Sequence, residues 1–507
     1  MNRVITACAA AIATALVLAG CSAGQSVDLG DTGGSGGALN AAIGGEPDQL
    51  DPQKTSSYFS FEVLENVFDT LVEPDENLEM QPALAERWET SDDQLTWTFH
   101  LRDDVVFQDG SEFSSADVVY SYRRIIDEKL ANAWKFSTIS DISAPDDSTV
   151  VITLTQPTPN LLSNLGGFKG MAIVQKANVE SGDIATAPIG TGPFSVSEYT
   201  QGDHITLKAN PDYWGGAPKL DGVTFRFISE PATALAALKS GEIQWTDVVP
   251  TQQVDQLEGD SSLTLGQEPS SDYWYLALNE AREPWSDVRV RQAIAYAIDR
   301  SAILKAVSYG TARENQLAIP EGSFWYTPYD TYSTDLAKAE KLLADAGFSG
   351  GTLDMLATSD YPETVTAAQI IAANLEPLGI EVNIRQPDFS TWLDEQNNGN
   401  FDMLMMGWLG NIDPDDFYYA QHHTDGSSNA QHYSNPEVDA LLDSARVEVD
   451  KDKRKDLYAQ AATIIADEGS YIYLYNPAVI QAWSPSLTGY ETRADRAIRF
   501  RDAALND

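Results

Sequence analysis

The sequence predicts a mixed α/β fold in which strands and helices alternate along one long chain. Residues 95–101, 150–154 and 223–227 carry apolar side chains at every second position, which is typical of strands that bury one face. Residues 290–298 and 336–343 carry them at helical spacing instead. Strands interleaved with helices favour layers of helix packed on sheet.

The segment 336–343 also shows how a predicted element ends. Gly347 follows the last apolar residues of this segment and is placed to end the helix, because glycine readily adopts the left-handed conformation at a helix C-terminus. We expect no tandem repeat and no low-complexity break from residue 39 onwards.

The first twenty residues predict a signal peptide. Arg3 supplies a positive start, and an apolar run over residues 9–18 is too short for a permanent membrane span. The run ends in Leu18-Ala19-Gly20-Cys21, which resembles the lipobox of bacterial lipoproteins. The resemblance implies cleavage before Cys21 and a lipid on its thiol, and the alternative is an ordinary secretory cleavage site.

The cysteines and the next segment extend this interpretation. The chain has two cysteines, and Cys8 lies inside the predicted signal peptide, so the mature chain is expected to have no thiol for a disulfide, a metal site or catalysis. Residues 21–38, which include the lipidated Cys21, are rich in Gly and Ser and predict a flexible tether. We therefore expect an extracytoplasmic body, lipid-anchored to the outer face of the cell membrane.

Charge and composition exclude several classes of protein. The 507 residues include 32 Lys and Arg against 76 Asp and Glu, for a net charge of −44. Such a charge repels phosphate backbones and argues against docking on anionic lipid through a basic face. With 43% hydrophobic and 10% aromatic residues, the chain has enough apolar surface for real cores and is not disordered over most of its length.

Catalytic motifs are not convincing. The pattern Gly-x-Ser-x-Gly occurs at residues 33–37 and 347–351. Neither match follows a strand and opens a helix, as the nucleophile elbow of a hydrolase requires. Walker and dinucleotide-binding motifs are also missing. We therefore expect a protein that is not an enzyme and has no cofactor.

Metal-binding patterns are equally weak. His422, His423 and His432 are neighbours in sequence, but their spacing matches no zinc signature. The acidic run 413–416 lacks the glycine and the terminal Glu of an EF-hand loop. We expect no metal site.

Four segments rich in aromatic residues, Gly and Pro do not fit a regular core. They admit two interpretations: walls of a ligand pocket with exposed backbone donors, or packing that closes a loop. The segments are residues 190–194, 272–275, 407–414 and 471–475.

Ordered motifs then appear along nearly the whole chain from Leu39. They are residues 46–52, 82–102, 107–110, 116–121, 191–194, 210–214 and 287–294. Together they resemble the motifs of extracytoplasmic solute-binding proteins of ABC importers, of the oligopeptide- and dipeptide-binding type (family 5).

The resemblance implies a two-lobed periplasmic-binding-protein-like fold of type II, the large peptide-binding class, with an extra subdomain in lobe I. Lobe I is expected to comprise residues 39–275 and 485–507, with the subdomain near residues 80–187. Lobe II is expected to comprise residues 276–484. In this family the lobes close on the ligand by a hinge motion.

The implied function is capture of a peptide or similar polar solute between the lobes and its delivery to the membrane permease and its ATPase subunits. We expect a monomer with no nucleic-acid partner. Three alternatives stay open at this point: a carrier of a sugar, opine or metallophore, a lipid-anchored secreted hydrolase, and a receptor of the same fold that signals rather than transports.

The resemblance also implies which residues line the cleft. In relatives an acidic residue and several aromatic residues lie there, and a loop after a strand meets the peptide's amino terminus. The matching positions are Glu46, Trp134, Tyr273, Trp274, Trp408, Leu409, Asn411, Asp413 and Tyr490.

Asn411 departs from the pattern of peptide carriers, which place an Asp there to pair with the ligand's ammonium group. An amide oxygen accepts a hydrogen bond but does not compensate a charge, so it forfeits much of the roughly 1.5–3 kcal/mol that a charged partner contributes. We expect either that Asp413 replaces the missing carboxylate or that the ligand lacks a free amine.

Overall fold

The computed structural model describes residues 36–506. The predicted signal peptide (residues 1–20), the lipidation site Cys21 and most of the predicted tether therefore lie outside the described residues. The described residues belong to one compact unit, and everything below concerns this unit.

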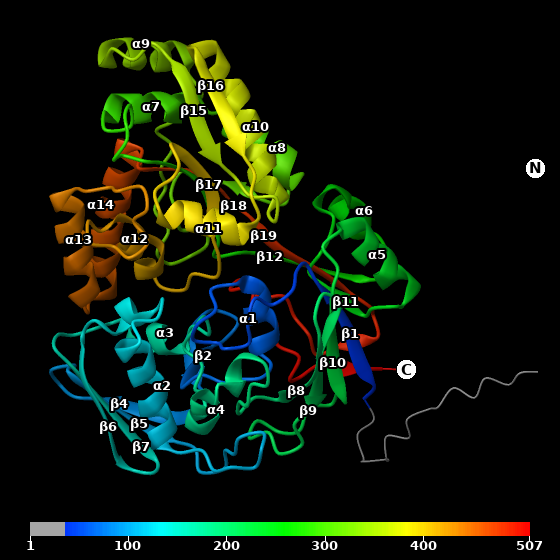
Figure 1. Cartoon of the computed structure of the whole chain (residues 1–507). Helices are drawn as coiled ribbons and strands as arrows, with labels where there is room; N and C mark the ends of the chain where they lie inside the picture. The colour runs from blue at the N-terminus through cyan, green and yellow to red at the C-terminus, as the bar shows by residue number, and fades with distance from the viewer. Residues whose placement is uncertain (1–35, 507) are drawn as a thin grey trace, which may run out of the picture. The chain divides into compact units, whose positions relative to one another are not determined.

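A seven-stranded mixed sheet forms the base of the first lobe (Figure 1). Its central strand β1 pairs in parallel with β10 and β11, and the other neighbours are antiparallel. In sheet order the strands are β12 (Thr264–Pro269), β19 (Ala478–Trp483), β11 (Trp245–Thr246), β1 (Ala38–Ile43), β10 (Gly222–Phe227), β9 (His204–Ala209) and β8 (Phe194–Thr200).

A four-stranded antiparallel sheet with its own apolar core extends this lobe. Helix α2 (Ser115–Asp127) covers it, contacting two of its strands (Figure 1). In order the strands are β4 (Ala85–Thr90), β5 (Thr96–Leu101), β7 (Thr149–Leu154) and β6 (Ile139–Asp146). We call the elements built on these two sheets lobe I.

A six-stranded sheet forms the second lobe, lobe II. The strands β15, β16 and β17 are parallel, and β13, β18 and β14 join them antiparallel. In order they are β14 (Arg313–Glu314), β18 (Tyr471–Asn476), β13 (Tyr273–Leu278), β17 (Met403–Trp408), β15 (Gly351–Leu356) and β16 (Ile380–Arg385).

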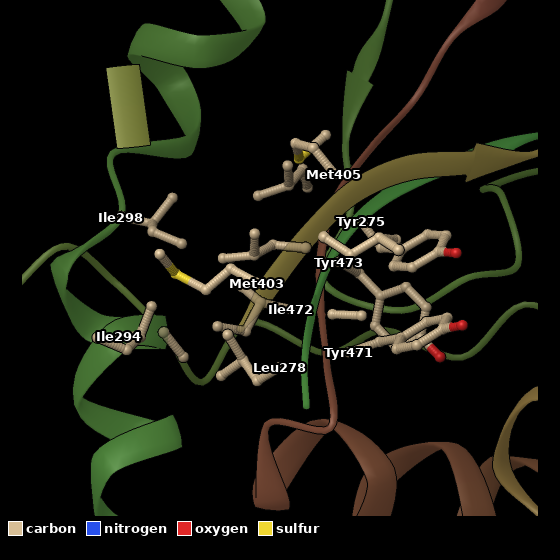
Figure 2. Packing of buried hydrophobic residues seen from close by; sticks show 14 of the residues in the cluster. Tyr275, Leu278, Ile294, Ile298, Met403, Met405, Tyr471, Ile472 and Tyr473 are labelled. Atoms are coloured by element: carbon tan, nitrogen blue, oxygen red, sulfur yellow. The ribbon is translucent and has the colours of Figure 1, made fainter. Parts of the chain in front are cut away.

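The core of lobe II is unusually aromatic. Tyr275 and Tyr471, on neighbouring strands, stack with ring centroids 3.8 Å apart. Figure 2 shows these rings beside Met403 and Met405 of β17, with Ile294 on the other side of the cluster. Burial of such large side chains supplies most of the lobe's stabilisation.

Helices and short strands complete both lobes. In lobe I the helices are α1 (Tyr58–Leu64), α2, α3 (Leu161–Gly166), α4 (Lys176–Ser181), α5 (Pro231–Ser240) and α6 (Val254–Leu257), with 3₁₀ helices η1 (Ala133–Phe136), η2 (Asp183–Ala185) and η3 (Thr251–Gln253). Two short pairs are β2 (Val72–Pro74) with β3 (Met80–Pro82), and β20 (Leu487–Thr488) with β21 (Ala504–Leu505).

The helices of lobe II cover its sheet; for example, α10 lies beside β16 (Figure 1). They are α7 (Val288–Ala297), α8 (Arg300–Ser308), α9 (Leu336–Ala346), α10 (Pro362–Leu375), α11 (Phe389–Asn397), α12 (Pro414–His422), α13 (Pro436–Val447) and α14 (Lys451–Glu468), with 3₁₀ helix η4 (Glu376–Leu378). Within residues 36–506, no helix combines the length and the apolarity needed to cross a bilayer.

The elements predicted from periodicity are confirmed. The three period-two runs coincide with β5, β7 and β10, and the two helical runs coincide with α7 and α9. Gly347 caps α9 in the left-handed region at φ +76° and donates its N–H to the carbonyl of Ala344.

The chain passes between the lobes at two neighbouring places. It leaves the seven-stranded sheet after β12 and enters the six-stranded sheet at β13, and it returns between β18 and β19 through Pro477. Ser270 ties the two crossovers together, since its Oγ donates to the carbonyl of Pro477 at 2.7 Å. The predicted domain boundaries, at residues 275 and 485, stay a prediction.

Candidate functional site

A cavity of about 450 Å³ lies in the described structure and is lined by residues of both lobes. Lobe I contributes α1, the loop around η1, the segment 163–169 and the tail 495–499. Lobe II contributes β13, α11 and the chain from the end of β17 into α12. A concave site shared by two lobes, mostly apolar with a few charged groups, has the properties of a small-molecule site.

The loop 408–412 between β17 and α12 forms one wall, and two glycines let it fit. A Cβ on Gly407 would lie 2.9 Å from the ring of Trp274, and one on Gly410 would lie 2.7 Å from Nζ of Lys169. Gly410 also has φ +58°, where side chains are strained. Gly410 therefore lets the loop approach lobe I closely, whereas Gly407, near the end of β17, makes room for Trp274 on the neighbouring strand of lobe II.

Asp272, in the crossover before β13, holds the same loop. Its Oδ1 accepts the N–H of Gly410 at 2.6 Å, and its other oxygen pairs with Arg496 of lobe I. Asn411 is buried and donates its side-chain N–H to the carbonyl of Ser271 at 3.4 Å. The loop is thus fixed to the crossover that joins the two lobes.

Opposite this wall, the segment 134–137 and α3 of lobe I contact helices of lobe II. Lys135 Nζ lies 2.8 Å from Oδ1 of Asp416 at the start of α12. The Trp134 ring stacks on Tyr419 with centroids 6.3 Å apart. Burial raises the pKa of the Asp416 carboxyl, but Lys135 and hydrogen bonds more than offset this effect and hold the pKa below its usual value.

We expect Lys135→Met to weaken solute binding about fivefold, because it removes an ion pair of about 1 kcal/mol that holds the lobes together. Isothermal titration of the variant and of wild type with the same ligand measures the change. Lys208→Met, at an exposed lysine of β9, is the matched control. An unchanged affinity in Lys135→Met would show that the pair does not contribute to closure.

Five of the residues predicted for the site line the cavity together: Trp134, Trp274, Trp408, Leu409 and Asn411. They come from both lobes, as a cleft requires. The indole N–H of Trp408 is buried and lies beside Tyr275 and Tyr471 of the lobe II core. Their contact with a ligand stays a prediction.

Glu46 and Tyr490, also predicted, lie away from the cavity. Oε1 of Glu46 accepts the hydroxyl of Tyr199 at 2.7 Å and the N–H of Gly202 at 3.1 Å, beside the edge strand β8. Tyr490 packs in the core of lobe I, and its hydroxyl donates to Gln481 at 2.8 Å. Internal partners already satisfy both side chains.

Tyr273 and Asp413 are likewise placed in the interior of lobe II. The hydroxyl of Tyr273 donates to the carbonyl of Phe417 at 3.2 Å, on the face that α12 covers. Asp413 caps the N-terminus of α12, and Arg454 donates to its two oxygens at 2.5 and 2.7 Å. The structure does not support the idea that Asp413 replaces the missing carboxylate at position 411, because its charge is already compensated.

The four aromatic segments divide between the two interpretations. Residues 274–275 and 407–412 line the cavity. Residues 471–475 are strand β18 in the core of lobe II. The segment 190–194 packs against residues 67 and 68, where a Cβ on Gly190 would meet the Val67 carbonyl at 2.1 Å.

Sequence reasoning missed several cavity residues. Lys169 and Glu65 are charged, and Tyr361, Phe389 and Trp392 form an aromatic wall from lobe II. No periodicity or motif marks them. Burial raises the pKa of Glu65 to about 7 and lowers that of Lys169 to about 8.

Of the three histidines that we expected not to bind metal, His422 lies in the core of lobe II. His422 is fully buried, its Nε2 lies 3.0 Å from the Tyr473 hydroxyl, and burial lowers its pKa to about 3. Within residues 36–506, no group of three or more His, Cys, Asp or Glu side chains is arranged to hold a metal ion.

A family model and a known relative each match more than half of the chain. A family model described as bacterial extracellular solute-binding proteins, family 5 Middle, matches residues 79–429. The glutathione-binding protein GsiB of Escherichia coli (strain K12) is 30% identical over 482 residues, covering 92% of this chain and 94% of GsiB.

Solved structures are similar over the same length. The periplasmic binding protein DppA of Helicobacter pylori, in complex with the peptide STSA, has TM-score 0.86 and 28% identity and covers 93% of this chain and 99% of its own. AgaA of A. tumefaciens R10, in complex with agropinic acid, has TM-score 0.85 and 30% identity, covering 93% and 99%.

Proposed function

The chain belongs to the bacterial extracellular solute-binding proteins of family 5, and from this we propose that it captures a short peptide or similar polar solute for an ABC importer. The solute would be held between the lobes and handed to the membrane permease. Relatives named for glutathione and for peptides support this class of cargo.

The cavity shared by the two lobes is the observation that carries the proposal. Its volume of about 450 Å³ lies in the lower part of the range of about 300–1,000 Å³ for small-molecule sites. A short solute fits such a volume better than a long peptide. The ion pair between Lys135 and Asp416 crosses from lobe to lobe, so a bound solute and a closed cleft stabilise each other.

We further propose that the protein is a lipid-anchored monomer that binds rather than reacts. The lipobox-like sequence ending at Cys21 supports the anchor, and the family consists of binding proteins. A tether of the predicted composition lets the body move freely near its permease.

Thermal unfolding of the purified body with a pool of dipeptides to tetrapeptides tests the proposed cargo. At about 100 times Kd, a ligand that binds only the folded state adds about 2.7 kcal/mol and raises Tm by a few degrees. We expect Trp408→Ala to lose most of this shift and Trp88→Ala, on the outer strand β4, to keep it. No shift with wild type at any pool concentration would refute a peptide cargo.

A further inference from the structure

Lys169 is a cation that reaches across the cavity without an acidic partner. It lies in the loop after α3, where its carbonyl accepts the side-chain N–H of Asn132 at 2.7 Å. Its ammonium lies so close to the loop of lobe II that a Cβ on Gly410 would come within 2.7 Å of Nζ. Among residues 36–506 this ammonium forms no ion pair within 4.0 Å. The acids that act on its charge, Asp272, Asp416 and Glu65, each pair with another cation instead.

The other ionised groups that line the cavity are paired. Each has an oppositely charged partner within about 3 Å: Lys135 with Asp416 (2.8 Å), Arg499 with Glu73 (3.1 Å) and Asp495 with Arg493 (3.1 Å). The remaining acid, Glu65, is buried, and burial raises its pKa to about 7, so it supplies only part of a negative charge. Among the described residues, Lys169 is therefore the cavity-lining cation that no ion pair compensates, in a protein whose total charge is −44.

We propose that Lys169 binds an anionic oxygen group of the solute, a carboxylate or a phosphate, at the end of the cavity formed by Gly410 and Asn411. A partly buried cation without a close partner costs free energy, and the solute's anion offsets that cost when the lobes close. The inference rests on the proposed function and narrows it to acidic solutes.

The neutral side chain at position 411 agrees with this polarity. The carboxyl of an Asp at that position would pair with Lys169 or repel an incoming anion, whereas the amide of Asn411 offers a hydrogen bond without charge. The neutral side chain at position 411 and the unpaired ammonium of Lys169 thus both favour a negatively charged group at this end of the solute.

The pH dependence follows from the groups around Lys169. Burial and, to a smaller extent, Lys135 lower its pKa to about 8, against the opposite effect of Asp272, Asp416 and Glu65. An anionic solute binds the protonated form, so affinity is expected to fall about tenfold per pH unit above pH 8, until bound-state deprotonation levels it.

Two peptide pools test the inference: dipeptides to tetrapeptides without Asp or Glu, as free acids and as the matched C-terminal amides. We expect wild type to prefer the acids by about tenfold or more, and Lys169→Met to lose that preference. Lys169→Gln repeats the test with a polar side chain. Lys176→Met, an exposed lysine of α4 paired with Glu180, is the control that keeps the preference.

The outcomes separate this inference from the proposed function. Equal binding of acids and amides by wild type, or a preference that survives in both Lys169 variants, overturns the role of Lys169 while leaving a peptide cargo intact. If neither pool binds, a peptide cargo is refuted. Mass spectrometry of the solute extracted from the native protein then tests the role of Lys169. A carboxylate or phosphate that is retained by wild type and lost from Lys169→Met supports the inference, and a neutral or basic solute overturns it.

Discussion

Arg454→Met is expected to lower the free energy of unfolding by about 3–5 kcal/mol. Arg454 is buried on α14 and donates to both oxygens of Asp413, the N-cap residue of α12. Its removal leaves the charge of Asp413 buried beside a second buried carboxylate, Asp415. Urea unfolding of wild type and variant measures the change.

The double variant Arg454→Met with Asp413→Asn is the informative control. Asn caps a helix nearly as well as Asp, so the double variant removes the uncompensated charge but keeps the cap. We expect it to recover much of the lost stability. The coupling energy then measures the strength of the interaction between Arg454 and Asp413. Equal destabilisation in the single and double variants would mean that packing, not charge, explains the loss.

Glu65→Gln is expected to stabilise the protein by roughly 3 kcal/mol above pH 7 and to have little effect near pH 4. The Glu65 side chain is 10% exposed, and burial raises its pKa from 4.5 to about 7 although Arg499 lies 3.8 Å away. Between pH 4.5 and about pH 7, Glu65 of the folded protein holds a proton that the unfolded chain has released. The wild type therefore loses stability as pH rises through this window.

Unfolding by urea at intervals from pH 4 to 8 tests this expectation. The difference between Glu65→Gln and wild type should grow over the window from pH 4.5 to 7 and then stay constant. Glu76→Gln, at an exposed position of the same lobe, should follow wild type throughout. A difference that does not change with pH would mean that Glu65 keeps an ordinary pKa.

Much of the fold could be predicted from the sequence, because burial of one face imposes a period. The alternation over residues 95–101 identifies β5, and the spacing from Leu336 to Leu343 with Gly347 identifies α9 and its end. Sheet order could not be predicted in this way, since β1 pairs with β10 and β19 with β12 across long separations that no local pattern records.

The site was predictable only where the chain itself carries the signal. The segment from Trp408 to Asn411 combines aromatic, small and polar residues, and it does line the cavity. The residues around Lys169 in the sequence form no such pattern. Its place in the site is evident only in the folded chain, where it lies beside Gly410 of the other lobe. Asp413 was misleading for the same reason, because its partner Arg454 lies on a different helix.

The position of β19 in the seven-stranded sheet has a consequence for the order of folding. β1 is among the first described residues and β19 among the last strands, yet both belong to one sheet, and Asn66 donates to the carbonyl of Ile498 in the C-terminal tail. Such non-local contacts delay folding until almost the whole chain is present. A chain that stops before β19 has neither a complete lobe I nor a second crossover. The ability to bind a solute is therefore acquired in one late step rather than gradually.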